Sequence, residues 1–118
     1  MSDNKPSVAH LHYIAGYLDG EATIGYWGNL PEIRIESCNP ASLRVISKYF
    51  GNEVKSKPLR KNVKWRPSFI IQYKGAKAVD LLSKVSAYMV EKKKQAENCL
   101  KMYELHQELH EDKRKLHQ

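Results

Sequence analysis

Apolar residues near the start of the chain recur at steps of three and four residues. The recurring positions are Val8, Leu11, Ile14, Ala15 and Leu18. This period matches one face of an α-helix. Ser7 precedes the first of them and is a favoured residue type for a helix N-cap, and Asp19-Gly20 ends the pattern. The spacing therefore predicts an amphipathic helix that begins after Ser7.

Two strands are predicted to follow this helix. Residues 22–27 are rich in β-branched and aromatic side chains, and Gly28-Asn29 after them is a turn signal. Residues 32–36 read Glu-Ile-Arg-Ile-Glu, which alternates strictly between charged and apolar. A period of two is typical of a strand with one buried and one polar face. The side chains expected to face the core of this hairpin are Ile24, Tyr26, Ile33 and Ile35.

Three further helices are predicted from caps and apolar stripes. Asn39-Pro40 is typical of a helix start, and Gly51 of a helix end. A third helix follows Gly75, and a last helix begins near Glu91. The three apolar stripes are Leu43, Ile46, Tyr49 and Phe50, then Ala78, Leu81, Leu82 and Val85, then Ala96, Cys99, Leu100 and Tyr103. Met102, Leu105 and Leu109 lie on a neighbouring line of the last helix.

A second pair of strands is predicted between the second and third helices. These strands run from Val54 to Leu59 and from Trp65 to Tyr73, and Pro67 favours an edge position or a bulge. The order is helix, two strands, helix, two strands, helix, helix. This order predicts an α+β fold with a four-stranded, mostly antiparallel sheet. We expect one domain over residues 1–118, with flexible ends at 1–7 and 111–118.

Composition limits the class of protein without deciding its function. The 118 residues are enough for one hydrophobic core, and 42% hydrophobic with 28% charged residues is a globular balance. No apolar run approaches the roughly 20 residues of a membrane span, and the polar first seven residues predict no signal peptide. Cys38 and Cys99 form no CxxC pair, so a zinc ribbon is excluded and an intracellular protein with reduced thiols is expected.

The positive charge is concentrated on the second predicted hairpin. The net charge is +7, and no acidic residue lies between Val54 and Val79. The basic residues of this stretch are Lys55, Lys57, Arg60, Lys61, Lys64, Arg66, Lys74 and Lys77. A twisted β-ribbon can enter a DNA groove and present every second side chain to it. Two alternatives stay open: an edge hairpin protected by lysines against aggregation, and a basic protein without a polyanionic partner.

The end of the first predicted helix carries an unusual set of residues. Ala15-Gly16 is a small pair inside a helical stretch, where Gly costs roughly 1 kcal/mol relative to Ala. Close contact between two helices would offset this cost, because small side chains let two backbones approach. Asp19 and Glu21 then flank Gly20, whose accessible carbonyl can join a carboxylate in binding a metal.

The stretch Ile14-Ala15-Gly16-Tyr17-Leu18-Asp19-Gly20-Glu21 resembles the LAGLIDADG motif of homing endonucleases. The resemblance implies an αββαββα fold with a C-terminal helix, and a homodimer when the chain has one motif. The activity implied is site-specific hydrolysis of a long, near-palindromic duplex, in the service of intron or intein mobility. The motif usually ends in Asp-Gly, where this chain has Glu21-Ala22.

The resemblance also implies roles for individual residues. Glu21 would bind Mg²⁺ or Mn²⁺ with the Gly20 carbonyl, and Ca²⁺ would bind without supporting cleavage. A downstream helix end followed by a lysine cluster resembles a late segment of the family. It makes Lys92 the active-site lysine, the alternative being a solvated basic turn, and Ser37 falls where the family often has a polar, solvent-organising residue. The predicted dimer interface comprises Tyr13, Ala15, Gly16, Tyr17 and Asp19.

Duplex DNA is the expected partner, with no membrane and no small-molecule substrate. The side chains expected to contact DNA are Thr23, Trp27, Arg34, Glu36, Lys55, Lys57, Arg60, Lys61, Lys64, Arg66 and Gln72. One alternative is a DNA- or RNA-binding regulator or intron maturase that keeps the fold and does not cut. Another is a basic interaction domain without nucleic acid. His106 and His110 share a helix face but lack a third ligand, so zinc binding there is set aside.

Overall fold

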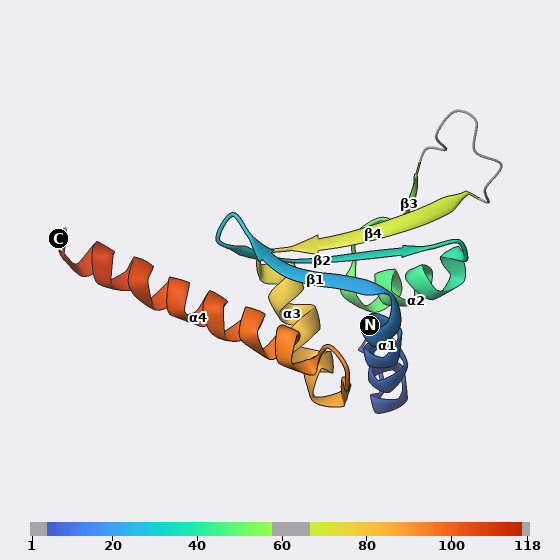
Figure 1. The fold of residues 1–118 in the computed structure, drawn as a ribbon, viewed down its shortest axis with the longest axis horizontal. Coiled ribbons are helices and arrows are strands. Elements are labelled where there is room, and N and C mark those ends of the chain that lie inside the picture. Colours follow the sequence, from blue (N-terminus) through green and yellow to red (C-terminus); the bar gives the residue numbers. More distant parts are fainter. Residues whose placement is uncertain (1–4, 58–66, 117–118) are drawn as a thin grey trace.

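In the computed structural model, a four-stranded sheet has all of the helices packed on one of its faces (Figure 1). The model describes the backbone of residues 5–57 and 67–116, and the side chains of these residues except 110 and 112–116. The elements are α1 (Val8–Glu21), β1 (Ala22–Trp27), β2 (Leu30–Ser37), α2 (Pro40–Phe50), β3 (Lys55–Lys57), β4 (Ser68–Lys74), α3 (Ala76–Val85), the short 3₁₀ helix η1 (Ser86–Tyr88) and α4 (Lys93–Leu116). This order confirms the predicted α+β class.

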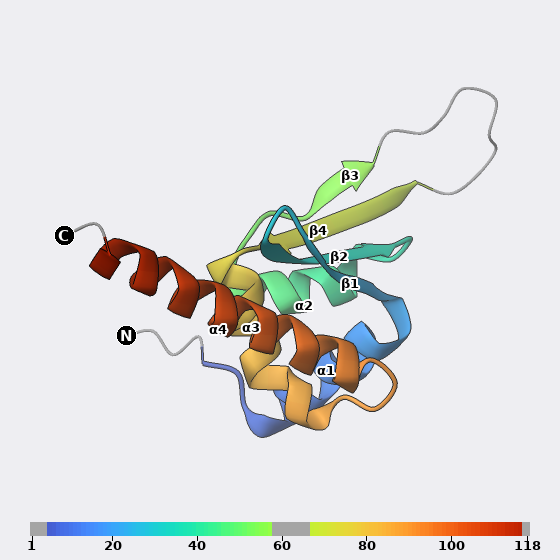
Figure 2. The same cartoon turned by 60° about the vertical axis from the view of Figure 1, so that its left-hand side comes forward.

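The sheet has the strand order β1-β2-β4-β3, and every neighbouring pair is antiparallel. The β1–β2 turn is formed by Gly28 and Asn29, whose φ angles of 58° and 65° fit the twist of a tight hairpin. β4 inserts between β2 and β3, so the second predicted hairpin flanks the first (Figure 2). The predicted strand ends at Leu59 and Trp65 lie outside the described residues.

The core lies between the sheet and the helices. Ile33 and Ile35 are fully buried on the covered face of the sheet, as the alternation predicts, and Tyr73 of β4 is fully buried beside Ile33. The four residues of the predicted stripe of α3 are also fully buried, namely Ala78, Leu81, Leu82 and Val85. The Tyr73 hydroxyl donates to the Gly51 carbonyl at 2.6 Å, and burial raises the pKa of this phenol, so it stays a neutral donor.

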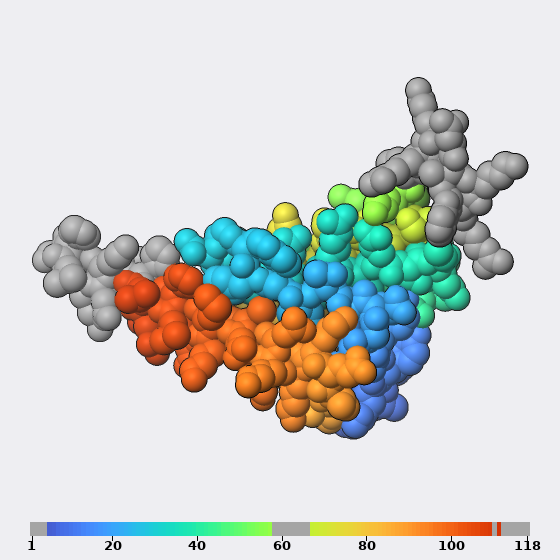
Figure 3. Space-filling model, viewed as in Figure 1, coloured from blue at the N-terminus to red at the C-terminus, as the bar shows by residue number. Residues whose placement is uncertain are grey.

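Tyr26 packs against the core on the predicted face of β1. It is only partly buried, and its ring stacks on His106 of α4 with 5.5 Å between ring centroids. The Tyr26 hydroxyl and His106 Nδ1 are 2.6 Å apart. The pair therefore joins β1 to α4, which lies along the β1–β2 hairpin (Figure 3).

Within the residues that the structure describes, a helix cap or a helix lies in each segment that was expected to be flexible. The Ser7 hydroxyl accepts the His10 backbone N–H at 3.2 Å and so caps α1. At the other end, α4 continues to Leu116, beyond the expected boundary at residue 111. Glu, Lys, Arg and Leu dominate this last stretch, and their high helix propensity favours continued helix. Among the described residues, no helix is long and apolar enough to cross a membrane.

Candidate nucleic-acid interface

The uncovered face of the sheet collects the residues expected to contact DNA. Strand register places Thr23, Arg34 and Gln72 side by side across β1, β2 and β4. The next row holds Glu36, Ile70 and Lys55. All of these except Glu36 and Ile70 are exposed, and those two are partly buried. Arg60, Lys61, Lys64 and Arg66 of the expected set lie outside the described residues.

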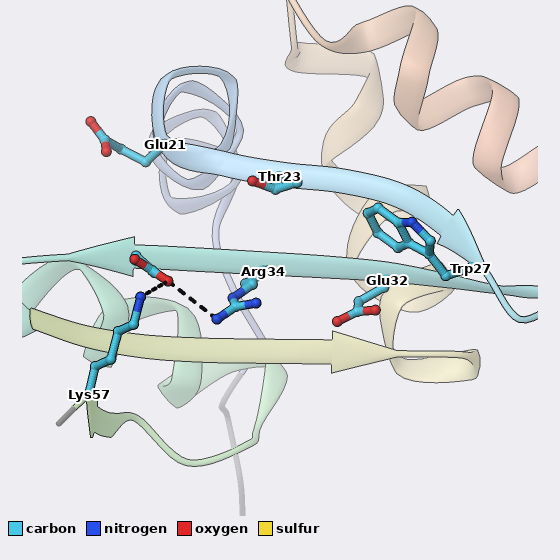
Figure 4. A pocket seen from close by; sticks show the side chains of 7 residues that line it. Glu21, Thr23, Trp27, Glu32, Arg34 and Lys57 are labelled. Carbon is cyan, nitrogen blue, oxygen red and sulfur yellow. Dashed lines mark hydrogen bonds and ion pairs between the residues drawn. The ribbon is translucent and has the colours of Figure 1, made fainter. Parts of the chain in front are cut away.

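A shallow hollow of about 680 Å³ occupies the middle of this face. Its lining residues are Glu21, Thr23, Trp27, Glu32, Arg34, Glu36 and Lys57. Glu21 lies at the end where β1 begins, and Trp27 lies at the other end of the same strand (Figure 4). The hollow therefore runs along β1 and β2, from the last residue of α1 to the hairpin turn.

Trp27 lies across its own strand. A Cβ placed at Gly25 would collide with the six-membered ring of Trp27, so only glycine leaves room for the indole. The indole remains 54% exposed and walls off the hairpin end of the hollow. An isolated glycine inside a strand pattern often marks such a close approach, and Gly25 is the signal that the sequence offered for it.

Another hollow, on the outer side of the sheet, extends the basic surface. It has a volume of about 480 Å³, and its lining includes Lys55, Gln72, Lys74 and Lys77. Lys74 and Lys77 belong to the acid-free stretch of the sequence but were not in the set expected to contact DNA. The ammonium of Lys77 donates to the Asn52 side-chain carbonyl at 2.6 Å, which holds α3 against the loop before β3.

Glu21 lies between two hollows. Besides lining the central one, it lines a second hollow of about 590 Å³ together with Glu36 and Ser37. Glu21 is exposed and, within the described part of the chain, has no ion-pair partner. The Ser37 hydroxyl accepts the backbone N–H of Asn39 at 3.0 Å. The fold thus brings two of the three predicted catalytic residues, Glu21 and Ser37, to one hollow.

Lys92, the third predicted catalytic residue, is held against the backbone that carries Glu21. Its ammonium donates to the Ala22 carbonyl at 2.5 Å and lies 3.5 Å from the Leu18 carbonyl. These two carbonyls flank Glu21 in the chain. Lys92 therefore stabilises the junction of α1 and β1 through the main chain.

Asp19 forms the other half of this junction. Its carboxylate accepts the backbone N–H groups of Val90 and Lys92 at 2.7 and 3.0 Å. Desolvation alone would raise the pKa of Asp19, but the backbone donors of residues 90–92 and the Lys92 charge outweigh it and lower the pKa below its ordinary 3.8. The Lys92 amide immediately precedes α4, so this bond also satisfies a backbone donor at the start of that helix, where no intrahelical acceptor exists.

We expect Asp19→Asn to lower the melting temperature at neutral pH by about 3–8 °C, equivalent to about 1 kcal/mol. The folded-state pKa of Asp19 is lowered, so its stabilisation is present above pH 3.8 and is lost as the pH falls through the folded value. The gap between parent and variant in thermal melts should therefore close in acid. Asp80→Asn is the control, since the one ion pair of the Asp80 carboxylate within the described residues is its exposed pair with Lys84. An equal gap at all pH values would contradict this role.

The residues expected at a dimer interface divide into two groups. Tyr13 and Gly16 are exposed on one face of α1, and Tyr17 beside them is half-buried. Ala15, in contrast, is fully buried in the core of its own chain, and Asp19 is bound to the backbone before α4. Ala15 and Asp19 therefore contact their own chain instead of presenting side chains to a partner, because the helix turns them toward the sheet and α4.

A close-packing face remains on α1 nevertheless. A Cβ added at Gly16 or at Gly20 would meet no atom within 4 Å. The two glycines are four residues apart and lie on the same side of the helix as Tyr13. This strip of missing side chains leaves the α1 backbone accessible.

The described residues contain no group of three or more His, Cys, Asp or Glu side chains arranged to hold a metal ion. Glu21 instead offers one exposed carboxylate beside the Gly20 backbone, and both are oxygen donors of the kind that Mg²⁺ prefers. Comparison with known proteins adds no assignment, because no family model and no curated protein matches the chain.

Proposed function

We propose that this chain is a site-specific, Mg²⁺-dependent DNA endonuclease of the LAGLIDADG type that acts as a homodimer. The observation that carries the proposal is the position of Glu21. The motif helix α1 ends at this carboxylate, which lines a hollow on the uncovered, largely polar face of a twisted sheet. A DNA backbone lying on that face would pass beside a free carboxylate.

The sheet is suited to a duplex in its shape and in its chemistry. Its uncovered face presents Arg34 and Gln72, which can hydrogen-bond to base edges, along with lysines that neutralise phosphates. The helices occupy the opposite face and leave this one free. The element order and the antiparallel sheet are compatible with the αββαββα arrangement that the motif implies.

Cleavage assigns separate tasks to the residues around Glu21. The Glu21 carboxylate and the Gly20 carbonyl would hold Mg²⁺, which when bound polarises a phosphate and lowers the pKa of a water molecule. Asp19 and Lys92 fix the position of Glu21 by joining the α1–β1 junction to the segment before α4. Ser37, in the adjacent hollow, would hydrogen-bond to water or to a phosphate oxygen.

The homodimer follows from the single copy of the motif. A double-strand cut needs two catalytic centres, and one chain supplies one Glu21. The accessible strip of α1, with Gly16 and Gly20, would pack against the same strip of a second copy. Two helices that cross at this strip would bring both Glu21 carboxylates near the two-fold axis.

The function is tested with the purified chain and a plasmid library that carries randomised duplex inserts. We expect linear products that depend on Mg²⁺ and disappear with EDTA, and duplex binding that weakens steeply as salt is raised. The sequenced ends of the products should converge on one near-palindromic site. Binding without a steep salt dependence would exclude a nucleic-acid role.

A non-cleaving DNA- or RNA-binding protein on the same fold is the second candidate. Two observations favour it: the motif ends in Glu21-Ala22 where Asp-Gly is usual, and the Lys92 ammonium is already bound to backbone carbonyls. This candidate predicts salt-dependent binding with no cut product in Mg²⁺ or Mn²⁺. The library experiment therefore separates the two candidates.

A further inference from the structure

Three charged side chains form a connected set in the middle of the uncovered face. Glu36 of β2 pairs through one carboxylate oxygen, Oε1, with Arg34 at 3.5 Å and with Lys57 of β3 at 3.0 Å (Figure 4). The three side chains are 47%, 40% and 45% exposed for Arg34, Glu36 and Lys57. Exposed ion pairs of this kind contribute little to stability, typically about 0–1 kcal/mol. Stabilising the fold is therefore a weak reason for their arrangement.

Arg34 occupies the place where a base-reading side chain would be most effective. It is on β2, an inner strand, between Thr23 of β1 and Gln72 of β4. A guanidinium has five N–H donors in a rigid fork, and two of them match the O6 and N7 acceptors of guanine in the major groove. Glu36 approaches the Nη2 end of this fork, and within the described residues no partner is seen for the other N–H groups of Arg34.

Glu36 restricts the conformations of the Arg34 side chain. A free arginine loses side-chain entropy when it is fixed on a base, and a neighbouring carboxylate reduces that loss by ordering the side chain beforehand. Lys57 on the same oxygen offsets the negative charge of Glu36, which would otherwise repel DNA phosphates. The three residues together make one ordered donor fork with a net positive charge.

We propose that Arg34 reads a guanine in the target duplex and that Glu36 is the positioning residue that sets the strength of this preference. The inference rests on the proposed DNA-binding function and is independent of cleavage. It differs from a direct role for Glu36, in which the carboxylate would accept a hydrogen bond from a cytosine amine.

The test is selection from a randomised duplex library by the parent chain, Glu36→Gln, Arg34→Gln and the double variant. We expect the parent to select guanine at one position of each half-site. Arg34→Gln should lose this preference, by roughly ten- to a hundredfold, since a good bidentate contact is worth about 1–3 kcal/mol. Glu36→Gln should weaken it about two- to fivefold at the same position, the range that an exposed ion pair can supply, while binding to random duplex becomes tighter because a negative charge is gone. In the Arg34→Gln background, Glu36→Gln should change nothing at that position.

Glu32→Gln is the matched control, because Glu32 lies on the same strand and the same face, with no ion pair to Arg34 among the described residues. It should leave the guanine preference unchanged. An equal loss in Glu32→Gln would reduce the effect to general charge, and a lost cytosine preference in Glu36→Gln would make Glu36 itself the reader. Either result overturns the inference but leaves the proposed function standing. If the parent chain binds no duplex, both the inference and the proposed function fail.

Discussion

Replacement of Glu21 by Gln is expected to abolish DNA cleavage and to leave DNA binding intact. The amide has nearly the same size and keeps one oxygen, but it removes the negative charge that a divalent cation requires. Several kcal/mol of transition-state stabilisation by the metal would be lost, which corresponds to a fall in cleavage rate of about three orders of magnitude. Because Glu21 is exposed and has no ion-pair partner in the described chain, the fold should be unaffected.

Two measurements are needed on the same protein samples. Cleavage is followed in single-turnover reactions with excess enzyme, and binding is followed by titration of the same duplex in Ca²⁺. Glu97→Gln serves as the matched control, since Glu97 is an exposed carboxylate on α4, behind the sheet. Glu21→Gln should bind the duplex as tightly as the parent, or more tightly. If Glu21→Gln cuts as fast as the parent, Glu21 is not the metal ligand and the assignment of the active site fails.

Periodicity predicted those parts of the fold that depend on local pattern. The alternation of residues 32–36 gave the correct faces for Ile33, Ile35, Arg34 and Glu36, because a strand has only two faces to choose between. The glycines and asparagines at the turn and at the helix caps were also informative, since their φ angles or capping side chains are needed there. Helix ends were less well predicted, as both ends of α4 show.

Contacts between distant segments could not be read from the sequence. Asp19 is bound by amides more than seventy residues away, and a helix pattern contains no information about that partner. Ala15 and Gly16 are adjacent in the motif, yet a 100° turn of the helix buries one and exposes the other. The ion pair between Glu36 of β2 and Lys57 of β3 likewise depends on the strand order, in which β4 lies between these two strands. The sequence therefore predicted which side chains lie on the uncovered face of the sheet better than it predicted the contacts between them.

Replacement of Gly16 by Gln is expected to stabilise the single chain and to break the dimer. Its Cβ would meet no atom of its own chain within 4 Å, and replacing a helical glycine with a good helix former gains about 0.5–1 kcal/mol. In a dimer packed through α1, the same side chain would enter the contact from both copies. Overpacking costs about 1–3 kcal/mol per site, so two copies should raise the dissociation constant at least about thirtyfold.

Because Gly16→Gln should raise the stability of the single chain and lower the affinity of the dimer, the two effects can be measured separately. Sedimentation velocity at several concentrations should show monomers of Gly16→Gln where the parent forms dimers, and thermal melts at the lowest concentration should show an unchanged or higher melting temperature. Ser83→Gln, which adds the same side chain at an exposed position of α3, is the control and should leave the parent's oligomeric state unchanged. Cleavage should fall with the dimer, because each chain brings one Glu21. A dimer that persists in Gly16→Gln would place the contact between copies elsewhere than on α1, since no close helix crossing accommodates two glutamines at this position.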